Sequence, residues 1–234
     1  MSWNEPTDLM PGLRTTYVAI VFFGTLTPVL GLYVFWNFSA GDWHTATAAL
    51  IYEYILVGIM LLGVGLLGVS AGKVGWSTIG FRRCSTDWIV RALILAPLLY
   101  AAGTLWRGIL QAAGLSRIFF PNIAEDQLIL ASGSSALVAG LGLVITILTP
   151  LAQETLLRGV LFAWLRRHMS FMIAAVASGP IFGLFHINIE RIGSAMVFSI
   201  VAAALYEASK SLWPAIVMHM TVNAVYFIYL VVKP

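Results

Sequence analysis

Residues 46–70 read ATAALIYEYILVGIMLLGVGLLGVS, and Glu53 is the only charged residue among them. A helix needs about 20 mostly apolar residues to cross a bilayer, because a backbone amide without a partner is too costly to leave in lipid. Similar apolar stretches lie near residues 16–37, 88–105, 128–165, 171–189, 192–208 and 213–232. The sequence therefore predicts an all-α fold, a polytopic bundle of seven or eight transmembrane helices.

The composition of the whole chain indicates the same class. Of its 234 residues, 60% are hydrophobic and 10% are charged, and the mean hydropathy is +0.91. A soluble domain carries about 25% charged residues, so this chain cannot cover its surface in water. A soluble enzyme, a disordered chain and a nucleic-acid-binding protein are excluded. The single cysteine, Cys84, excludes an internal disulfide and any Cys-rich zinc or iron–sulfur site.

The polar segments are short. The first 15 residues lack the basic start and short apolar core of a signal peptide, so we expect a soluble or interfacial tail there. The polar connections near 71–87 and 106–127 are too short for a second domain. We therefore expect one integral-membrane domain over residues 1–234.

The stretch 128–165 allows two interpretations. It would be about 57 Å long as a helix, which is too long for one straight crossing. It is either one tilted or kinked helix that begins after Gly133, or two helices that break at Pro150.

Basic residues help to choose, because Lys and Arg are enriched on the cytoplasmic side of membrane proteins. With seven crossings, the side of the N-terminus collects Arg14, Lys73, Arg82, Arg83, Arg91, Arg166, Arg167 and Lys210. The other side then holds Arg107, Arg117, Arg191 and Lys233. Eight crossings would divide these residues almost evenly, so we predict seven crossings and a cytoplasmic N-terminus.

Polar side chains within the apolar stretches cannot reach an interface and therefore indicate function or pairing. They are Glu53, Gln153, Glu154, Arg158, His186, His219 and Asn223. The aspartates fall in a tail, a loop or helix ends, whereas an aspartyl intramembrane protease needs two of them within the bilayer. The sequence contains no HExxH motif, which the usual helical zinc proteases carry. Glu53 either lines the same cavity as the others or reaches an interface.

Three pairs of residues have helical spacing. Glu154 and Arg158 are four residues apart, so they share a helix face and can pair, whereas Gln153 points about 100° away. Taken alone, the pair is explained as well by a structural ion pair that ties helices together as by a functional site. Phe182 and His186 have the same spacing, as do His219 and Asn223. If residues 166–170 form a tight turn, positions 153 and 186 reach similar depths, which predicts one water-holding cavity.

These residues resemble the CAAX protease and bacteriocin-processing family of intramembrane proteases. The family pattern is Glu-Glu-x-x-x-Arg, then Phe-x-x-x-His, then His-x-x-x-Asn or Asp. The chain has Gln153-Glu154-x-x-x-Arg158, Phe182-x-x-x-His186 and His219-x-x-x-Asn223, in that order on successive apolar stretches. Arg158-Gly159 and Leu212-Trp213-Pro214 also fit, and the resemblance covers about residues 140–225.

The resemblance implies a glutamate-dependent endopeptidase, similar to the type 2 CAAX prenyl endopeptidases, that needs no metal or other cofactor. Its substrate would be a membrane-associated peptide or a lipidated protein tail. In the family, the first Glu and the His of the second block activate a water molecule. The last His and Asn stabilise the oxyanion, which assigns these roles to His219 and Asn223.

The chain departs from the family pattern at Gln153, because an amide cannot accept a proton as a carboxylate does. Either Gln153 marks an inactivated form of a protease, or the chain is a natural non-catalytic relative. A third interpretation makes Glu154 the base, although its pairing with Arg158 weakens that idea.

Two other functions compete with the peptidase. One is a non-catalytic membrane protein that binds a peptide or lipidated tail in the same cavity. The other is a metal-dependent protease that uses Glu154, His186 and His219, which is disfavoured because Glu154 is expected to pair with Arg158.

Overall fold

The computed structural model describes residues 3–5, 7–9, 14–38, 45–115, 125–184 and 189–232, and these residues form helices joined by turns. No strand occurs in the described ranges, so the predicted all-α fold is confirmed. The helices are α1 (Thr15–Phe38), α2 (Ala46–Leu62), η1 (Gly63–Ser70), α3 (Trp76–Ile79), α4 (Thr86–Ala112), α5 (Glu125–Ala131), α6 (Ser135–Leu143), η2 (Val144–Leu148), α7 (Thr149–Glu154), η3 (Thr155–Phe162), α8 (Ala163–Arg166), α9 (Phe171–Leu184), α10 (Ile189–Ser209) and α11 (Trp213–Val232).

Within the described residues, six helical segments are long and apolar enough to cross a membrane. They are 15–36, 46–70, 86–112, 135–166, 192–209 and 213–232. Helix α9 contributes a shorter apolar segment, Phe171–Phe182. The six segments and α9 correspond roughly to the seven predicted stretches, although the described part of α9 is shorter than a full span. Large apolar side chains such as Phe23, Leu62 and Leu98 remain exposed, as expected on faces that contact lipid.

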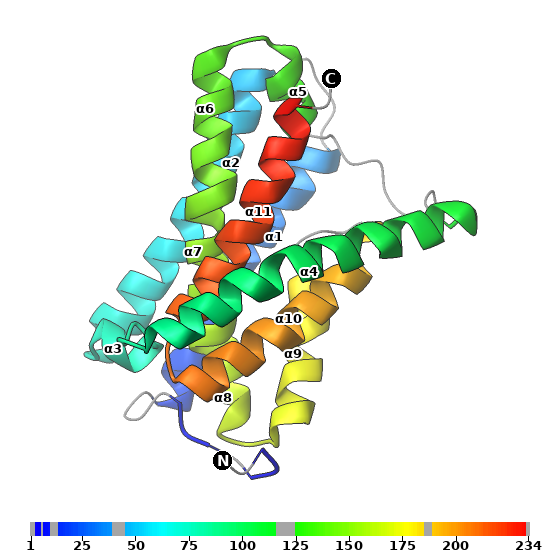
Figure 1. Cartoon of the computed structure of the whole chain (residues 1–234). Helices are drawn as coiled ribbons and strands as arrows, with labels where there is room; N and C mark the ends of the chain where they lie inside the picture. Colours follow the sequence, from blue (N-terminus) through cyan, green and yellow to red (C-terminus); the bar gives the residue numbers. More distant parts are fainter. Residues whose placement is uncertain are drawn as a thin grey trace.

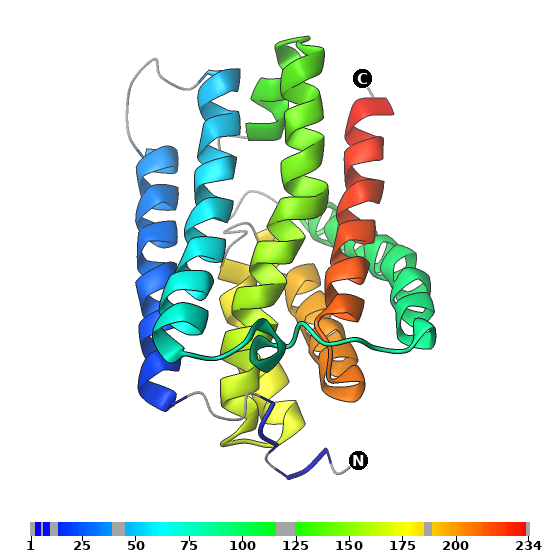
Figure 2. The same ribbon diagram turned by 90° about the vertical axis from the view of Figure 1, so that its left-hand side faces the viewer.

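The helices α1, α2, α11 and the segment 135–166 run roughly side by side along the long dimension of the molecule (Figures 1 and 2). Helices α4 and α10 cross them obliquely, and α9 lies beside α10 (Figure 1). Helix α4 packs against both α10 and α11. This crossing brings α4, α10 and α11 together near the middle of the bundle, where the candidate site lies.

The segment 135–166 is one continuous helix, which confirms the first of the two interpretations of this stretch. It begins after Gly133, which has a φ of +65° suited to glycine, and the Ser134 side chain caps it by accepting a hydrogen bond from Leu137 N–H. The π-helical segments η2 and η3 interrupt its α-helical hydrogen bonding. Such interruptions bend helices and are frequent at functional sites.

Helix α4 continues to Ala112, whereas the sequence predicted a polar connection from residue 106. Trp106 explains part of the extension, because α10 packs closely on its ring. A Cβ on Gly193 would lie 2.6 Å from the Trp106 ring, so only glycine allows this approach. Arg107 therefore lies on a packed helix and not in a loop.

The described part of the N-terminal tail packs against the end of the bundle that carries α8 (Figure 1). Thr7 N–H donates to the Arg166 carbonyl, and Phe171 N–H donates to the Trp3 carbonyl. The Arg166 guanidinium is fully buried and binds both carboxylate oxygens of Glu207, at 3.0 and 2.9 Å. This segment is thus part of the packed structure and not only an interfacial tail.

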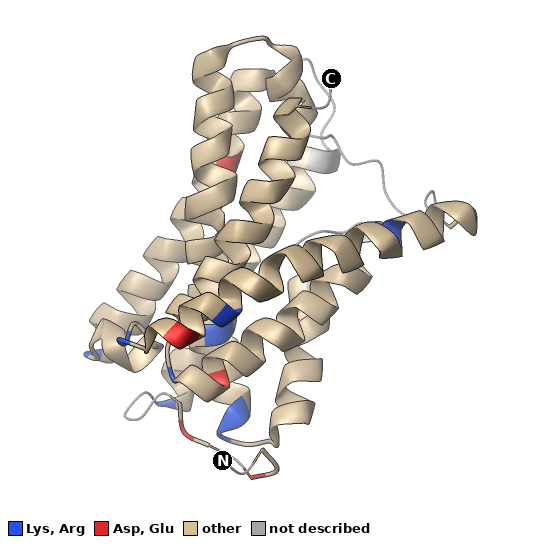
Figure 3. Cartoon of the chain, in the orientation of Figure 1, with Lys and Arg blue, Asp and Glu red and all other residues tan. Residues whose placement is uncertain are grey.

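Charged positions are distributed unevenly over the molecule. In the part of the chain that the structure describes, most Lys and Arg residues lie at the end where the N-terminal segment is found (Figure 3). Lys210 is one of them, with its ammonium 3.6 Å from Glu207. Partial burial lowers the pKa of Lys210, and the Glu207 carboxylate opposes that shift. Basic residues therefore gather at one end of the described bundle, while the cytoplasmic orientation of that end stays a prediction.

Candidate active site

The predicted pair of Glu154 and Arg158 is confirmed. Arg158 Nη1 donates to Glu154 Oε1 at 3.1 Å, and Arg158 Nε lies 3.1 Å from Glu154 Oε2. The side chain of Glu154 is fully buried and that of Arg158 is 1% exposed. Each charge would be very costly in an apolar interior without the other.

His219 joins this pair from α11. Its Nδ1 lies 2.8 Å from Glu154 Oε1, which joins two residues 65 positions apart in the sequence. An ionised carboxylate can only accept hydrogen bonds, so Nδ1 carries the hydrogen. The other ring nitrogen, Nε2, is thereby left for a ligand. Glu154 orients His219 much as the aspartate of a catalytic triad orients its histidine.

Two aromatic rings enclose this charged cluster. The Arg158 guanidinium lies over Phe182, 4.8 Å from the ring centroid, and 5.7 Å from that of Phe198. Both rings also contact the His219 imidazole, with centroids 5.8 and 4.7 Å away. Ring faces stabilise the cation and exclude water, which strengthens the electrostatic contacts inside.

Glycine after Arg158 is required by packing. A Cβ on Gly159 would lie 2.7 Å from the backbone oxygen of Ile79, and a backbone atom cannot move aside as a flexible side chain can. Gly159 therefore lets η3 approach the short helix α3. This contact explains the Arg-Gly pair of the first motif.

Asn223 is fixed by the irregular hydrogen bonding of the long helix. In η2, Thr149 N–H donates five residues back, to the Val144 carbonyl. In the same register Pro150 would bond the Ile145 carbonyl, but proline has no N–H. Asn223 Nδ2 supplies the missing donor, at 2.7 Å from the Ile145 oxygen. One amide hydrogen of Asn223 is used in this way, and the second is left for a ligand.

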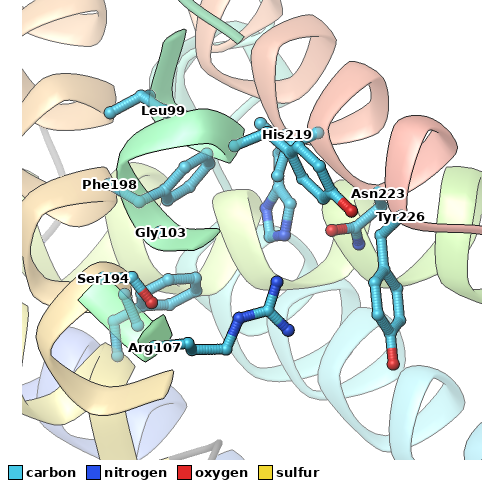
Figure 4. A pocket seen from close by; sticks show the side chains of 12 residues that line it. Leu99, Gly103, Arg107, Ser194, Phe198, His219, Asn223 and Tyr226 are labelled. Carbon is cyan, nitrogen blue, oxygen red and sulfur yellow. The ribbon is translucent and has the colours of Figure 1, made fainter. Parts of the chain in front are cut away.

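His219 and Asn223 line one cavity of about 190 Å³ between α4, α9, α10 and α11. Figure 4 shows both side chains at its wall, with Arg107 from α4 pointing toward them. The cavity lining consists of Leu99, Tyr100, Gly103, Arg107, Phe182, Ser194, Ala195, Phe198, His219, Val222, Asn223 and Tyr226. Its lining is mostly apolar, with a few polar side chains contributed by α4, α10 and α11, a composition that ligand sites share.

The remaining candidate residues are Gln153, His186 and Glu53, and the two that the structure describes, Gln153 and Glu53, do not line the cavity. Gln153 is half-buried next to Glu154, and its side chain forms no hydrogen bond with another described residue. His186 lies outside the described residues, so its predicted position beside Gln153 stays a prediction. Glu53 lies in α2 and does not line the cavity near His219.

Sequence reasoning missed Phe198, Ser194 and Arg107 at this cavity. Phe198 and Ser194 are four residues apart on α10, but an apolar helix offers many such pairs. Arg107 was assigned to a connection because it follows the most apolar part of its stretch. A charged residue directly after an apolar stretch is the feature of the sequence that could have identified Arg107 as a site residue.

Residues 134–225 match the family described as Type II CAAX prenyl endopeptidase Rce1-like. The predicted resemblance is confirmed. The matched segment contains His219 and Asn223, which line the cavity, and the pair of Glu154 and Arg158, which contacts His219 behind it. It begins at the N-cap of the long helix and ends within α11.

A curated relative supports the same class. The chain is 27% identical over 81 residues to YdiL of Bacillus subtilis (strain 168), whose name describes a candidate membrane peptidase. The alignment covers 35% of this chain and 33% of YdiL, so the chain spans about a third of the length of this relative. No solved structure matches the chain significantly. The apolar helices indicate a multi-pass membrane protein, and these matches show that part of the chain is similar to membrane proteases.

Proposed function

We propose that this protein has the fold of an intramembrane endopeptidase and binds a membrane-associated peptide or a lipidated protein tail beside His219 and Asn223. The observation that carries the proposal is the 2.8 Å contact between Glu154 and His219, which orients a histidine at the wall of a largely apolar cavity. The match of residues 134–225 to a prenyl endopeptidase family supports it.

His219 and Asn223 are suited to stabilising negative charge on a peptide carbonyl. His219 lines the cavity and its Nδ1 contacts Glu154, so we assign Nε2 to the substrate carbonyl, with the Glu154 carboxylate offsetting the positive charge of an imidazole that donates from both nitrogens. Asn223 is held by the Ile145 carbonyl and keeps one amide hydrogen free. Donors fixed in advance in a dry site stabilise a transition state without reorganising, which is the largest contribution in many acyl-transfer enzymes.

Water activation is assigned to position 153 together with His186. Gln153 can bind a water molecule but cannot take its proton, so the chain with glutamine is expected to hydrolyse peptides slowly. Glu154 is a poor substitute. Its side chain is fully buried, and its two oxygens already contact Arg158 and His219.

Gln153 also favours a second candidate function. A site with the binding residues intact and no base would hold a peptide without cleaving it, as a membrane scaffold does. This alternative uses the same cavity and differs from the peptidase only in the absence of turnover.

The orientation in the membrane follows from charge. The end of the bundle that carries the N-terminal segment also carries most of the described basic residues, and we propose that this end faces the cytoplasm (Figure 3). Residues 1–234 are proposed to act as a single integral-membrane domain.

The test is a cleavage assay in detergent or lipid nanodiscs with a panel of membrane peptides. Gln153→Glu is expected to cleave at least one of them, and adding His186→Ala or His219→Ala should remove that activity. A chelator should leave it unchanged. Activity lost with the chelator would favour a metal-dependent protease. Tight peptide binding without cleavage by any form would favour the scaffold.

A further inference from the structure

Arg107 is a cation in the wall of the candidate site that the proposed chemistry does not use. It lies on α4 and lines the same cavity as His219 and Asn223. Its side chain is half-buried, and Figure 4 shows the guanidinium directed into the space toward those two residues. A permanently charged group at this place needs a physical reason.

Among the described residues, the partners of Arg107 do not supply that reason. The hydrogen bond from its Nη2 to the Thr104 hydroxyl is long, at 3.4 Å. No carboxylate of the described residues lies within 4 Å of it, whereas Arg158 and Arg166 each have a buried glutamate. A guanidinium has five N–H donors in a planar fork that matches a carboxylate.

An arginine near a helix end can instead extend toward the lipid headgroups. Arg107 is five residues before the end of α4, about 7.5 Å by the rise of a helix. A side chain extended to the headgroups would follow the helix toward Ala112, whereas this guanidinium points across the cavity (Figure 4). The close contact of Trp106 with α10 at Gly193 holds this part of α4 in place.

We propose that Arg107 binds a carboxylate of the peptide substrate and so determines specificity, an inference that rests on the proposed peptidase site. Arg107 lines the same cavity of about 190 Å³ as His219 and Asn223, and an extended peptide advances about 3.5 Å per residue. The carboxylate is accordingly placed about two residues from the carbonyl that His219 and Asn223 bind. An acidic side chain or the C-terminus of the peptide can provide it.

Binding of fluorescent membrane peptides to the chain with Gln153 tests this inference without requiring turnover. Three peptides that differ only near the bound carbonyl are compared, with a C-terminal carboxylate, with a C-terminal amide, and with an amide plus an acidic side chain two residues away. We expect at least one carboxylate peptide to bind about tenfold or more tightly than the neutral one, the range for a charge-assisted hydrogen bond. The two carboxylate peptides distinguish the source of the charge.

Arg107→Gln should bind all three peptides with equal affinity, and Arg107→Lys should retain part of the preference. Arg91→Gln is the matched control, because Arg91 is on the same helix but packs on Trp88, outside the cavity lining. A parent protein that binds the three peptides equally, while His219→Ala weakens all of them, would overturn the role of Arg107 and leave the peptide site intact. No binding of any peptide, together with no cleavage by Gln153→Glu, would overturn the proposed function and this inference with it.

Discussion

Removing the positive charge of Arg158 should destabilise the fold much more than removing an exposed arginine. The change Arg158→Met keeps an unbranched side chain of similar length that can pack on Phe182, but it leaves Glu154 without its cation. Glu154 is fully buried and would keep His219 as its only partner at hydrogen-bond distance among the described side chains.

The expected magnitude follows from this burial. Breaking a buried ion pair by removing one partner costs about 3–5 kcal/mol, because the other charge stays in the apolar interior. For a chain of this size, each kcal/mol corresponds to about 2–4 °C in Tm, so the expected decrease is about 6–20 °C. Changing both partners, with Glu154→Gln and Arg158→Met together, should cost less than the sum of the single changes.

Thermal unfolding of purified protein in one detergent provides the measurement. Arg167→Gln is the matched control, because Arg167 is 3.5 Å from Asp8 and both side chains are partly exposed. Such a surface pair contributes less than about 1 kcal/mol. Equal Tm values for Arg158→Met and Arg167→Gln would refute the conclusion that Glu154 and Arg158 stabilise each other in the interior.

Two further changes test how the backbone supports the site. Gly159→Ala should reduce the free energy of unfolding by about 1–3 kcal/mol and so lower Tm, because the new Cβ would meet the Ile79 carbonyl oxygen at 2.7 Å. An unchanged Tm would show that α3 can move away. Pro150→Ala should keep the helix stable but restore an N–H that competes with Asn223 for the Ile145 carbonyl. In the Gln153→Glu background it should lower the cleavage rate by about tenfold or more, since Asn223 loses its fixed position; an unchanged rate in a folded protein would contradict that role of Pro150.

The fold could be predicted well from the sequence, because the constraint of the bilayer acts on each helix separately. About 20 apolar residues in a row make a spanning helix whatever surrounds them. The limits of α4 were predicted less well. Trp106 and Arg107 are polar enough in sequence to suggest a loop, and only the contact with Gly193 of α10 explains why the helix continues.

For the candidate site, contacts within one helix could be predicted from the sequence, whereas contacts between helices could not. The pair of Glu154 and Arg158 follows from helical spacing, which the sequence contains directly. The contact of Glu154 with His219 depends on how two helices are rotated against each other, and no spacing in the sequence specifies that rotation. The same holds for Arg166 and Glu207, whose pairing across 41 positions shows that Arg166 is more than an orientation signal.

The hydrogen bond between Asn223 and the Ile145 carbonyl could not be predicted without knowing the local hydrogen-bond pattern of the long helix. The sequence showed Pro150 in an apolar stretch and Asn223 on a later one, without a connection between them. Only the π-helical register of η2 makes the Ile145 carbonyl the group that proline leaves unpaired. Irregular helices are difficult to predict from periodicity because they change it locally.

In the proposed function, position 153 controls the activation of water at a cavity that already binds substrate. The decisive measurement is the single-turnover cleavage rate of one membrane peptide by the parent chain and by Gln153→Glu, at saturating enzyme. General-base catalysis contributes about 10²–10⁴-fold, so Gln153→Glu is predicted to cleave at least about a hundredfold faster while binding the peptide with similar affinity. Equal rates in the two forms would place the base elsewhere and contradict the assignment of position 153.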